Sequence, residues 1–197
     1  MFDDPVAIKA PVATVASATP EKQAQDEKVD EVRQYFIQLA GDDMEIDWEE
    51  LKDVLDFATR KETANHGFSR DVCKSIVALL DADHSGKLGF EEFKSLWSLI
   101  KNAKQIFAKH DKDSSGSLSG FELRHALNSC GYLLNTHVLN LLMHRYGNKK
   151  AEIAFDEFIL CALKLKTMIE TFQRKTKGGA QAITLSFDDW IETTLYS

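Results

Sequence analysis

Residues 111–122 read DKDSSGSLSGFE, and this stretch decides the fold. A twelve-residue loop that binds calcium needs oxygen ligands at positions 1, 3, 5, 7 and 12, with glycine at position 6 for a sharp turn. The stretch has acids or hydroxyls at the side-chain positions and Gly116 at the turn. An acidic helix cap would explain one Asp or Ser, but not the whole spacing. The pattern therefore predicts a calcium loop between two helices.

The same pattern occurs thirty residues earlier, where residues 81–92 read DADHSGKLGFEE. Gly86 stands at the turn, and Lys87 at position 7 offers only its backbone carbonyl. The expected ligands are Asp81, Asp83, Ser85, Lys87 and Glu92 in this loop, and Asp111, Asp113, Ser115, Ser117 and Glu122 in the other. Leu88 and Leu118 occupy the position at which paired loops exchange a short strand contact. Such a repeat indicates an array of helix–loop–helix units.

A third acidic stretch, residues 39–51 (LAGDDMEIDWEEL), lacks this regular core. If Ile46 is its strand residue and Glu50 its closing carboxylate, the loop begins at Ala40 and is one residue shorter than the standard. The expected ligands are then the carbonyl of Ala40, Asp43, the carbonyl of Glu45, and Glu50, all hard oxygen donors suited to calcium. The residues alone also allow a solvated acidic turn before a helix.

Two further loops depart from binding chemistry. The fourth, aligned on Ile153 and Glu157, has Lys150 in a ligand position and Ala151 at the turn. The fifth is aligned on Ile183, and its ligand positions are held by Thr176, Gly178, Ala180 and Phe187. We expect the fifth loop to bind no calcium, because no acid occupies any of these positions.

The order of these loops carries a family resemblance. The chain resembles the penta-EF-hand domain of calpains, the calcium-dependent cysteine proteases. The resemblance rests on a short first loop with AGDDMEI (40–46) and a closing Glu, on two regular and two degraded loops after it, and on the final sequence Leu-Tyr-Ser (195–197). The resemblance covers residues 27–197. In that family the short first loop does bind calcium, through the positions held here by Ala40, Asp43, Glu45 and Glu50. The resemblance therefore favours a site there and implies an all-α fold of five EF-hands.

Composition is consistent with one folded domain that follows a linker. Residues 1–25 are rich in Ala, Pro, Thr and Val without a helical apolar stripe, and we expect a flexible linker there, with the calcium-binding domain at 26–197. Helical apolar spacing predicts two long helices, one leaving the second loop and entering the third, and another over 155–174. The first hand is expected to pair with the second and the third with the fourth.

Charge and cysteine usage limit the partners and the compartment. The net charge of −7 disfavours nucleic acid and allows at most peripheral membrane contact, and the longest apolar run is too short to span a bilayer. Cys73, Cys130 and Cys161 are too few and too scattered for a disulfide framework or a zinc cluster, so a cytoplasmic location is expected. None lies in a sequence that resembles a papain-type nucleophile, and we expect no catalytic core in this chain.

The predicted function is calcium sensing by the regulatory domain of a calpain-type protease, as a small subunit or as the C-terminal part of a catalytic chain. A free-standing penta-EF-hand adaptor and a calcium buffer are the alternatives. The fifth hand has no internal partner, so we expect it to form a homodimer or a heterodimer with another calpain subunit. The apolar residues expected at that interface are Leu165, Met168, Ile169, Phe172, Ile183, Trp190, Ile191 and Leu195.

A second expected contact is a groove around the first two hands for an amphipathic helix, such as one from the calpain inhibitor calpastatin. The candidate residues are Trp48, Phe57, Leu96 and Trp97. Aromatic residues at helical spacing also occur in ordinary cores, and this alternative stays open at the level of sequence.

Overall fold

The computed structural model describes residues 32–60, 67–176 and 182–195. Residues 32–39 are helical, and the elements that follow are η1 (Gly41–Asp43), α2 (Trp48–Ala58), α3 (Arg70–Leu80), α4 (Phe90–His110), β1 (Ser117–Ser119), α5 (Gly120–Ser129), α6 (Thr136–Tyr146), β2 (Glu152–Ala154), α7 (Phe155–Lys175) and α8 (Phe187–Leu195). The expected all-α EF-hand array is confirmed. The linker expected at 1–25 lies outside the described residues, and the boundary at residue 26 stays a prediction.

In each exit helix of the first three hands, the closing glutamate of the loop is the third residue of the helix. Asp47 caps α2 in a capping box with Glu50, whose Oε2 accepts a hydrogen bond of 3.0 Å from the Asp47 N–H. Ser119 and Glu122 form the same box at α5, at 3.0 Å. These bonds satisfy N–H groups that a helix start leaves without a partner. The residue that should close each loop therefore also stabilises the helix start.

Backbone bridges between loops pair the hands as expected. Ile46 and Leu88 exchange two hydrogen bonds of 2.9 and 2.8 Å, which join the first loop to the second. Leu118 lies opposite Ile153 in the antiparallel pair β1–β2, which joins the third loop to the fourth. All four side chains are fully buried, so each bridge also anchors its loops to the core.

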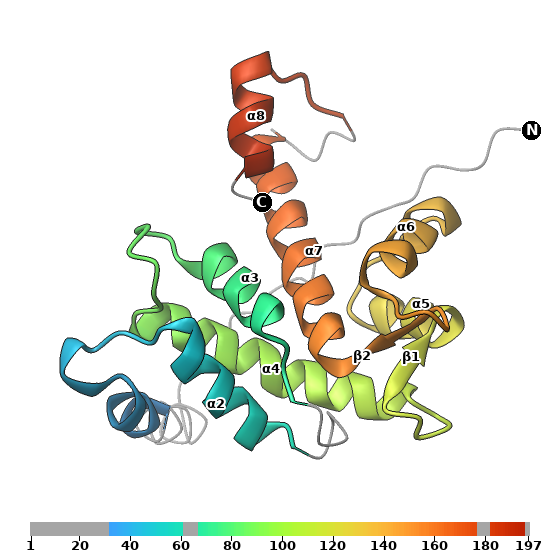
Figure 1. Ribbon diagram of the computed structural model, residues 1–197. Coiled ribbons are helices and arrows are strands. Elements are labelled where there is room, and N and C mark those ends of the chain that lie inside the picture. Colours follow the sequence, from blue (N-terminus) through green and yellow to red (C-terminus); the bar gives the residue numbers. More distant parts are fainter. Residues whose placement is uncertain (1–31, 61–66, 177–181, 196–197) are drawn as a thin grey trace, which may run out of the picture.

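Two long helices connect the hands. α4 runs from the second loop to the third, and α7 runs from the fourth loop toward the fifth hand, as the apolar spacing predicted. In Figure 1 the first two hands lie at one end of α4, the third and fourth lie at the other, and α7 rises between them. Both shared helices therefore belong to two hands at once.

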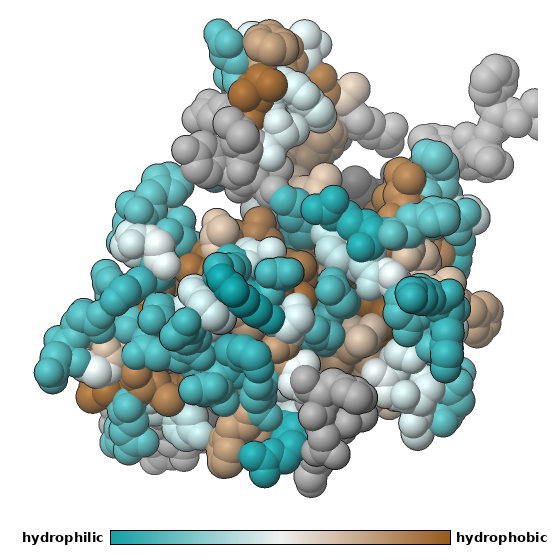
Figure 2. Space-filling view, in the orientation of Figure 1, coloured by the Kyte–Doolittle hydropathy of each residue, from teal (hydrophilic) through white to brown (hydrophobic). Residues whose placement is uncertain are grey.

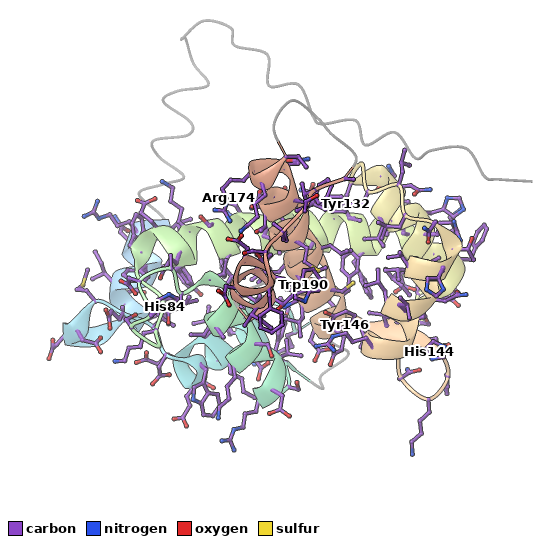
Figure 3. The ribbon with its side chains drawn as sticks, turned by 90° about the horizontal axis from the view of Figure 1, so that it is seen from above. His84, Tyr132, His144, Tyr146, Arg174 and Trp190 are labelled. Carbon is purple, nitrogen blue, oxygen red and sulfur yellow. The ribbon has the colours of Figure 1, made fainter. Side chains whose placement is uncertain are left out.

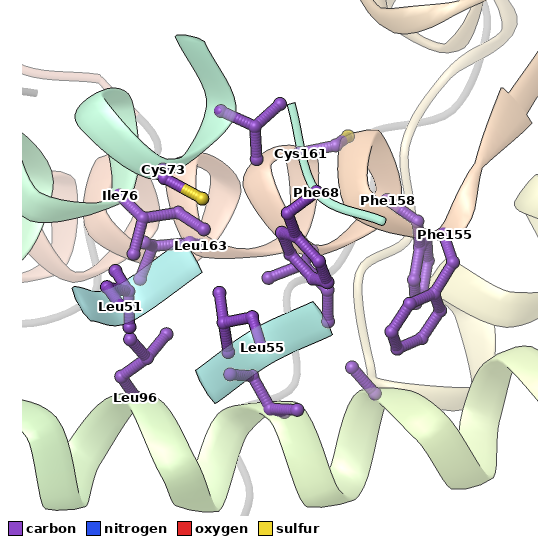
Figure 4. Packing of buried hydrophobic residues seen from close by; sticks show 14 of the residues in the cluster. Leu51, Leu55, Phe68, Cys73, Ile76, Leu96, Phe155, Phe158, Cys161 and Leu163 are labelled. Atoms are coloured by element: carbon purple, nitrogen blue, oxygen red, sulfur yellow. The ribbon is translucent and has the colours of Figure 1, made fainter. Parts of the chain in front are cut away.

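An aromatic cluster joins α4, α7 and the segment before α3. The Phe155 ring packs edge-on against Phe68 and Phe107, with centroids 6.2 and 5.1 Å apart, and Phe107 also contacts Phe158 at 5.6 Å. Figure 4 shows this cluster continuing into the aliphatic packing around Leu51, between the same helices. One apolar core therefore spans both pairs of hands.

The fifth hand projects from this body. α8 lies beside the C-terminal end of α7 and away from α5 and α6 (Figure 1). Among the described residues, no helix combines the length and the apolar character that crossing a bilayer requires.

Truncation of the aromatic cluster tests its role in joining the two pairs of hands. Phe107 is 2% exposed and contacts two other rings. We expect Phe107→Ala to lower the free energy of unfolding by about 3–5 kcal/mol, because it removes a large buried side chain and leaves a cavity. Urea denaturation in calcium-free buffer measures this change. Phe57→Ala is the control, since Phe57 is 66% exposed, and an equal loss in both variants would contradict the assignment.

Candidate calcium sites

The second loop brings its acids together. One carboxylate oxygen from each of Asp81, Asp83 and Glu92 lies within 4.8 Å of the other two. The Asp81 carboxylate accepts hydrogen bonds from the backbone N–H groups of Ser85 and Gly86, at 2.9 and 2.7 Å. The loop therefore folds around its first ligand position.

The third loop repeats this geometry. Asp111, Asp113 and Glu122 form the equivalent cluster within 4.8 Å, and Asp111 accepts from the Gly116 N–H at 3.0 Å. The φ of Gly116 is +75°, a left-handed conformation that glycine adopts without strain. The backbone conformation at position 6 therefore favours glycine, as the motif indicates.

The closing glutamates already reach back across their loops. Glu92 Oε1 accepts from the Ala82 N–H at 2.8 Å, and Glu122 Oε1 accepts from the Lys112 N–H at 3.1 Å. Each carboxylate thus lies opposite the start of its own loop. The converging hard oxygens fit calcium, which takes six to eight such ligands in flexible geometry.

Hydrogen bonding favours the ionised form of three of the clustered acids, Asp83, Asp113 and Glu122. Bonds from Ser85 lower the pKa of Asp83, and bonds from Ser115 lower the pKa of Asp113. The Ser119 hydroxyl lowers the pKa of Glu122 in the same way. A carboxyl group must be deprotonated to bind a metal ion. At neutral pH these three groups can therefore bind calcium without first releasing a proton.

The first loop has a different shape. It passes through the short helix η1 and then through Met44, whose φ of +58° turns the chain toward the Ile46 bridge. Asp43 Oδ1 accepts from the Glu45 N–H at 3.3 Å, and Ala40 is buried beneath the loop. Only two of its four expected ligands are carboxylates, so a three-acid cluster is not formed. Its ligand set, Ala40, Asp43, Glu45 and Glu50, stays a prediction.

A contact between the first two loops was not anticipated from the sequence. The Lys87 ammonium lies 2.5 Å from Asp43 Oδ2, although the two residues are 44 positions apart. The interaction lowers the pKa of Asp43 and raises that of Lys87. A lysine was expected to contribute only its carbonyl here, and nothing in either loop alone indicates the partner of its side chain.

The fourth loop keeps the turn without the ligands. Ala151 has a φ of +57°, and the Asn148 side chain accepts from the N–H groups of Lys150 and Glu152 at 2.8 and 3.1 Å. Burial raises the pKa of Glu157, the closing residue. No acidic cluster forms here within the described chain, and residues 177–181 of the fifth loop lie outside it.

The four groove candidates have different environments. Leu96 is 1% exposed and belongs to the core, so it does not line an open groove and that assignment is corrected. Trp97 packs between Tyr35 and Phe93, with centroids 5.9 and 5.7 Å away. Trp48 lies under the cations of Arg70 and Lys74, and Phe57 is exposed. Helical spacing identified all four as apolar positions but could not separate core from surface.

The fifth hand exposes a large apolar surface. Met168, Trp190 and Ile191 are 50%, 56% and 40% exposed. Two of these residues, Met168 and Trp190, line a cavity of about 170 Å³ together with Phe172, Ile183 and other residues of the fifth hand. Figure 2 shows hydrophobic side chains on this projecting hand, and Figure 3, which looks roughly along α8, shows the Trp190 side chain pointing sideways from that helix.

Comparisons with known proteins agree with this architecture. Residues 102–131 match the family described as EF-hand domain, and residues 78–97 match the family described as EF hand. A solved homolog of programmed cell death 6 protein from Leishmania major Friedlin shares the fold, with a TM-score of 0.66 and 24% identity over 84% of this chain and 88% of that one.

Curated relatives extend the match to almost the whole chain. Calpain small subunit 2 of Homo sapiens is 37% identical over 95% of this chain and 76% of its own length. Calpain-B of Drosophila melanogaster is 43% identical over 91% of this chain, and Calpain-A of the same organism is 35% identical over 99%. The chain spans only 19% of Calpain-B and 33% of Calpain-A.

Calcium titration tests the ligand assignments. We expect three ions per chain, with affinities of roughly micromolar to submillimolar, because the regular loops offer three carboxylates each and the short one offers two. Glu92→Gln and Glu122→Gln should each remove one site, since each replaces the bidentate ligand of its loop. Isothermal calorimetry measures the stoichiometry.

The fourth loop supplies the matched control for this titration. Glu157 holds the same closing position, but no acidic cluster surrounds it in the described structure. Glu157→Gln should therefore leave the stoichiometry at three. A site lost in this variant, or retained in both of the others, would contradict the assignment.

Proposed function

Because the chain belongs to the calpain penta-EF-hand family, we propose that it is the calcium-sensing regulatory domain of a calpain-type cysteine protease. The observation that carries this proposal is the combination of two acidic clusters with a fifth hand that projects away from the other four in the described part of the chain. A plain calcium buffer would need only the clusters. The exposed fifth hand favours a domain that reports calcium binding to another subunit.

The ligand sets are part of the proposal. In each regular loop the three clustered acids are joined by a hydroxyl and a backbone carbonyl: Ser85 and Lys87 in one, Ser115 and Ser117 in the other. The short loop adds a third site through Ala40, Asp43, Glu45 and Glu50. Each closing glutamate is also the third residue of its exit helix, so calcium bound by that carboxylate would act directly on the helix.

The cysteines support a regulatory rather than a catalytic role. Burial raises the pKa of Cys73 and of Cys161 to about 12, and neither would form the thiolate that a cysteine protease needs. Cys130 is exposed, but its thiol pKa is also raised. We assign catalysis to a different part of the assembly and place the domain in the cytoplasm, where three free thiols are stable.

The partner surface is assigned to the fifth hand. EF-hands pair because each loop contributes a short strand and each helix pair leaves an apolar face to cover. Four hands are paired here by the Ile46–Leu88 and Leu118–Ile153 bridges. A second fifth hand, from this chain or from another calpain subunit, would cover Met168, Trp190 and Ile191.

Substitution at Trp190 tests this interface. We expect the wild-type chain to be a dimer at micromolar concentration with or without calcium, and Trp190→Glu to be a monomer, because the variant places a charge at the centre of the apolar face. Sedimentation equilibrium measures the mass, and calcium stoichiometry should be unchanged. Leu141→Glu, at a side chain 53% exposed on α6, is the control and should stay dimeric. A monomeric wild type would contradict the proposal.

Capture from native cell extract tests the proposed function as a whole. The immobilised chain should retain a catalytic calpain subunit, identified by mass spectrometry, and Trp190→Glu should lose it. Calpastatin should be retained only with calcium, because we propose that calcium binding opens the first two hands and exposes the half-buried Trp97. Retention of unrelated proteins and of no calpain would favour a free-standing adaptor instead.

A further inference from the structure

The second loop places a positive charge on the first. Lys87 occupies position 7 of the second loop, and its ammonium lies 2.5 Å from Asp43 Oδ2 of the first. The next residue, Leu88, forms the backbone bridge with Ile46, which lies three positions after Asp43. The bridge therefore holds the two residues at a fixed register, so the fold itself determines that they meet.

The other pair of loops lacks this contact. At position 7 of the third loop stands Ser117, whose hydroxyl donates a 3.2 Å hydrogen bond to Glu152 of the fourth. The residue three positions before the Ile153 bridge is Lys150, so the carboxylate is missing as well. The cross-loop ion pair is thus specific to the pair of loops in which the short loop is a proposed calcium site.

We propose that Lys87 sets the calcium affinity of the first loop as a built-in competitor. Its ammonium holds an oxygen of Asp43 and must leave before that oxygen can serve as a ligand. The inference rests on the proposed ligand role of Asp43. Because the carbonyl of Lys87 is itself a proposed ligand of the second loop, one residue acts on both sites.

Exposure of the pair sets the size of the effect. The Lys87 and Asp43 side chains are 36% and 52% exposed, so water and salt screen their attraction. Ion pairs of this kind change an equilibrium by no more than roughly fivefold. The lysine therefore tunes the first site and does not close it.

Removal of the charge with retention of the side-chain length tests the inference. In Lys87→Met, the calcium concentration that half-fills the first loop should fall by roughly two- to fivefold. NMR titration resolves the sites, with the amide signals of Gly41, Gly86 and Gly116 reporting the first, second and third loops. Lys94→Met is the matched control, because it removes the same charge from a lysine that pairs with Glu91, which is not a proposed ligand.

A calcium-free measurement gives an independent readout. The side-chain ammonium signal of Lys87 should be protected from exchange in the wild type and lost in Asp43→Asn. An unchanged Gly41 midpoint in Lys87→Met, or an equal shift in Lys94→Met, would overturn the inference while leaving the site intact. A Gly41 signal that responds to calcium equally in the wild type and in Glu50→Gln would overturn the first site itself, and the inference with it.

Discussion

The backbone bridge between paired loops is the interaction on which the rest of the structure depends. Each bridge joins one buried aliphatic residue to another, Ile46 to Leu88 and Leu118 to Ile153, and thereby places two loops back to back. This arrangement fixes which helices share a core and which acids face each other. It also explains why an odd number of hands is expected to leave one without an internal partner, since each of these loops pairs with one other loop.

The bridge and the ion site are separable properties of a loop. The fourth loop has lost the ligands, yet Ala151 keeps the left-handed turn and Ile153 keeps the strand contact with the third loop. A non-glycine residue at such a φ carries some strain, which the surrounding bonds to Asn148 offset. The fourth hand therefore still pairs with the third through its strand, although its loop forms no acidic cluster in the described structure.

Local patterns were predictable from the sequence, and contacts between distant segments were less so. The ligand spacing of residues 81–92 and 111–122 specifies both loop geometry and helix starts, so the hands, their pairing and the two long helices were foreseen. Leu96 was placed on a surface because apolar helical spacing is the same for core and groove. The contact of Lys87 with Asp43 depends on the register between two hands and on the direction of a flexible side chain, which neither loop encodes alone.

The length of α4 has a mechanical consequence. Its 21 residues form one continuous rod of about 31 Å, with Glu92 in its first turn and Asp111 at its C-terminal cap. A tilt of about 10° at one end would displace the other by roughly 5 Å, provided the helix does not bend. A continuous helix could therefore couple the second and third loops as a rigid body, without a chain of side-chain rearrangements. Phe93, Ile100 and Phe107 pack into the core along this rod, so a tilt of α4 would also disturb the apolar core that joins the two pairs of hands.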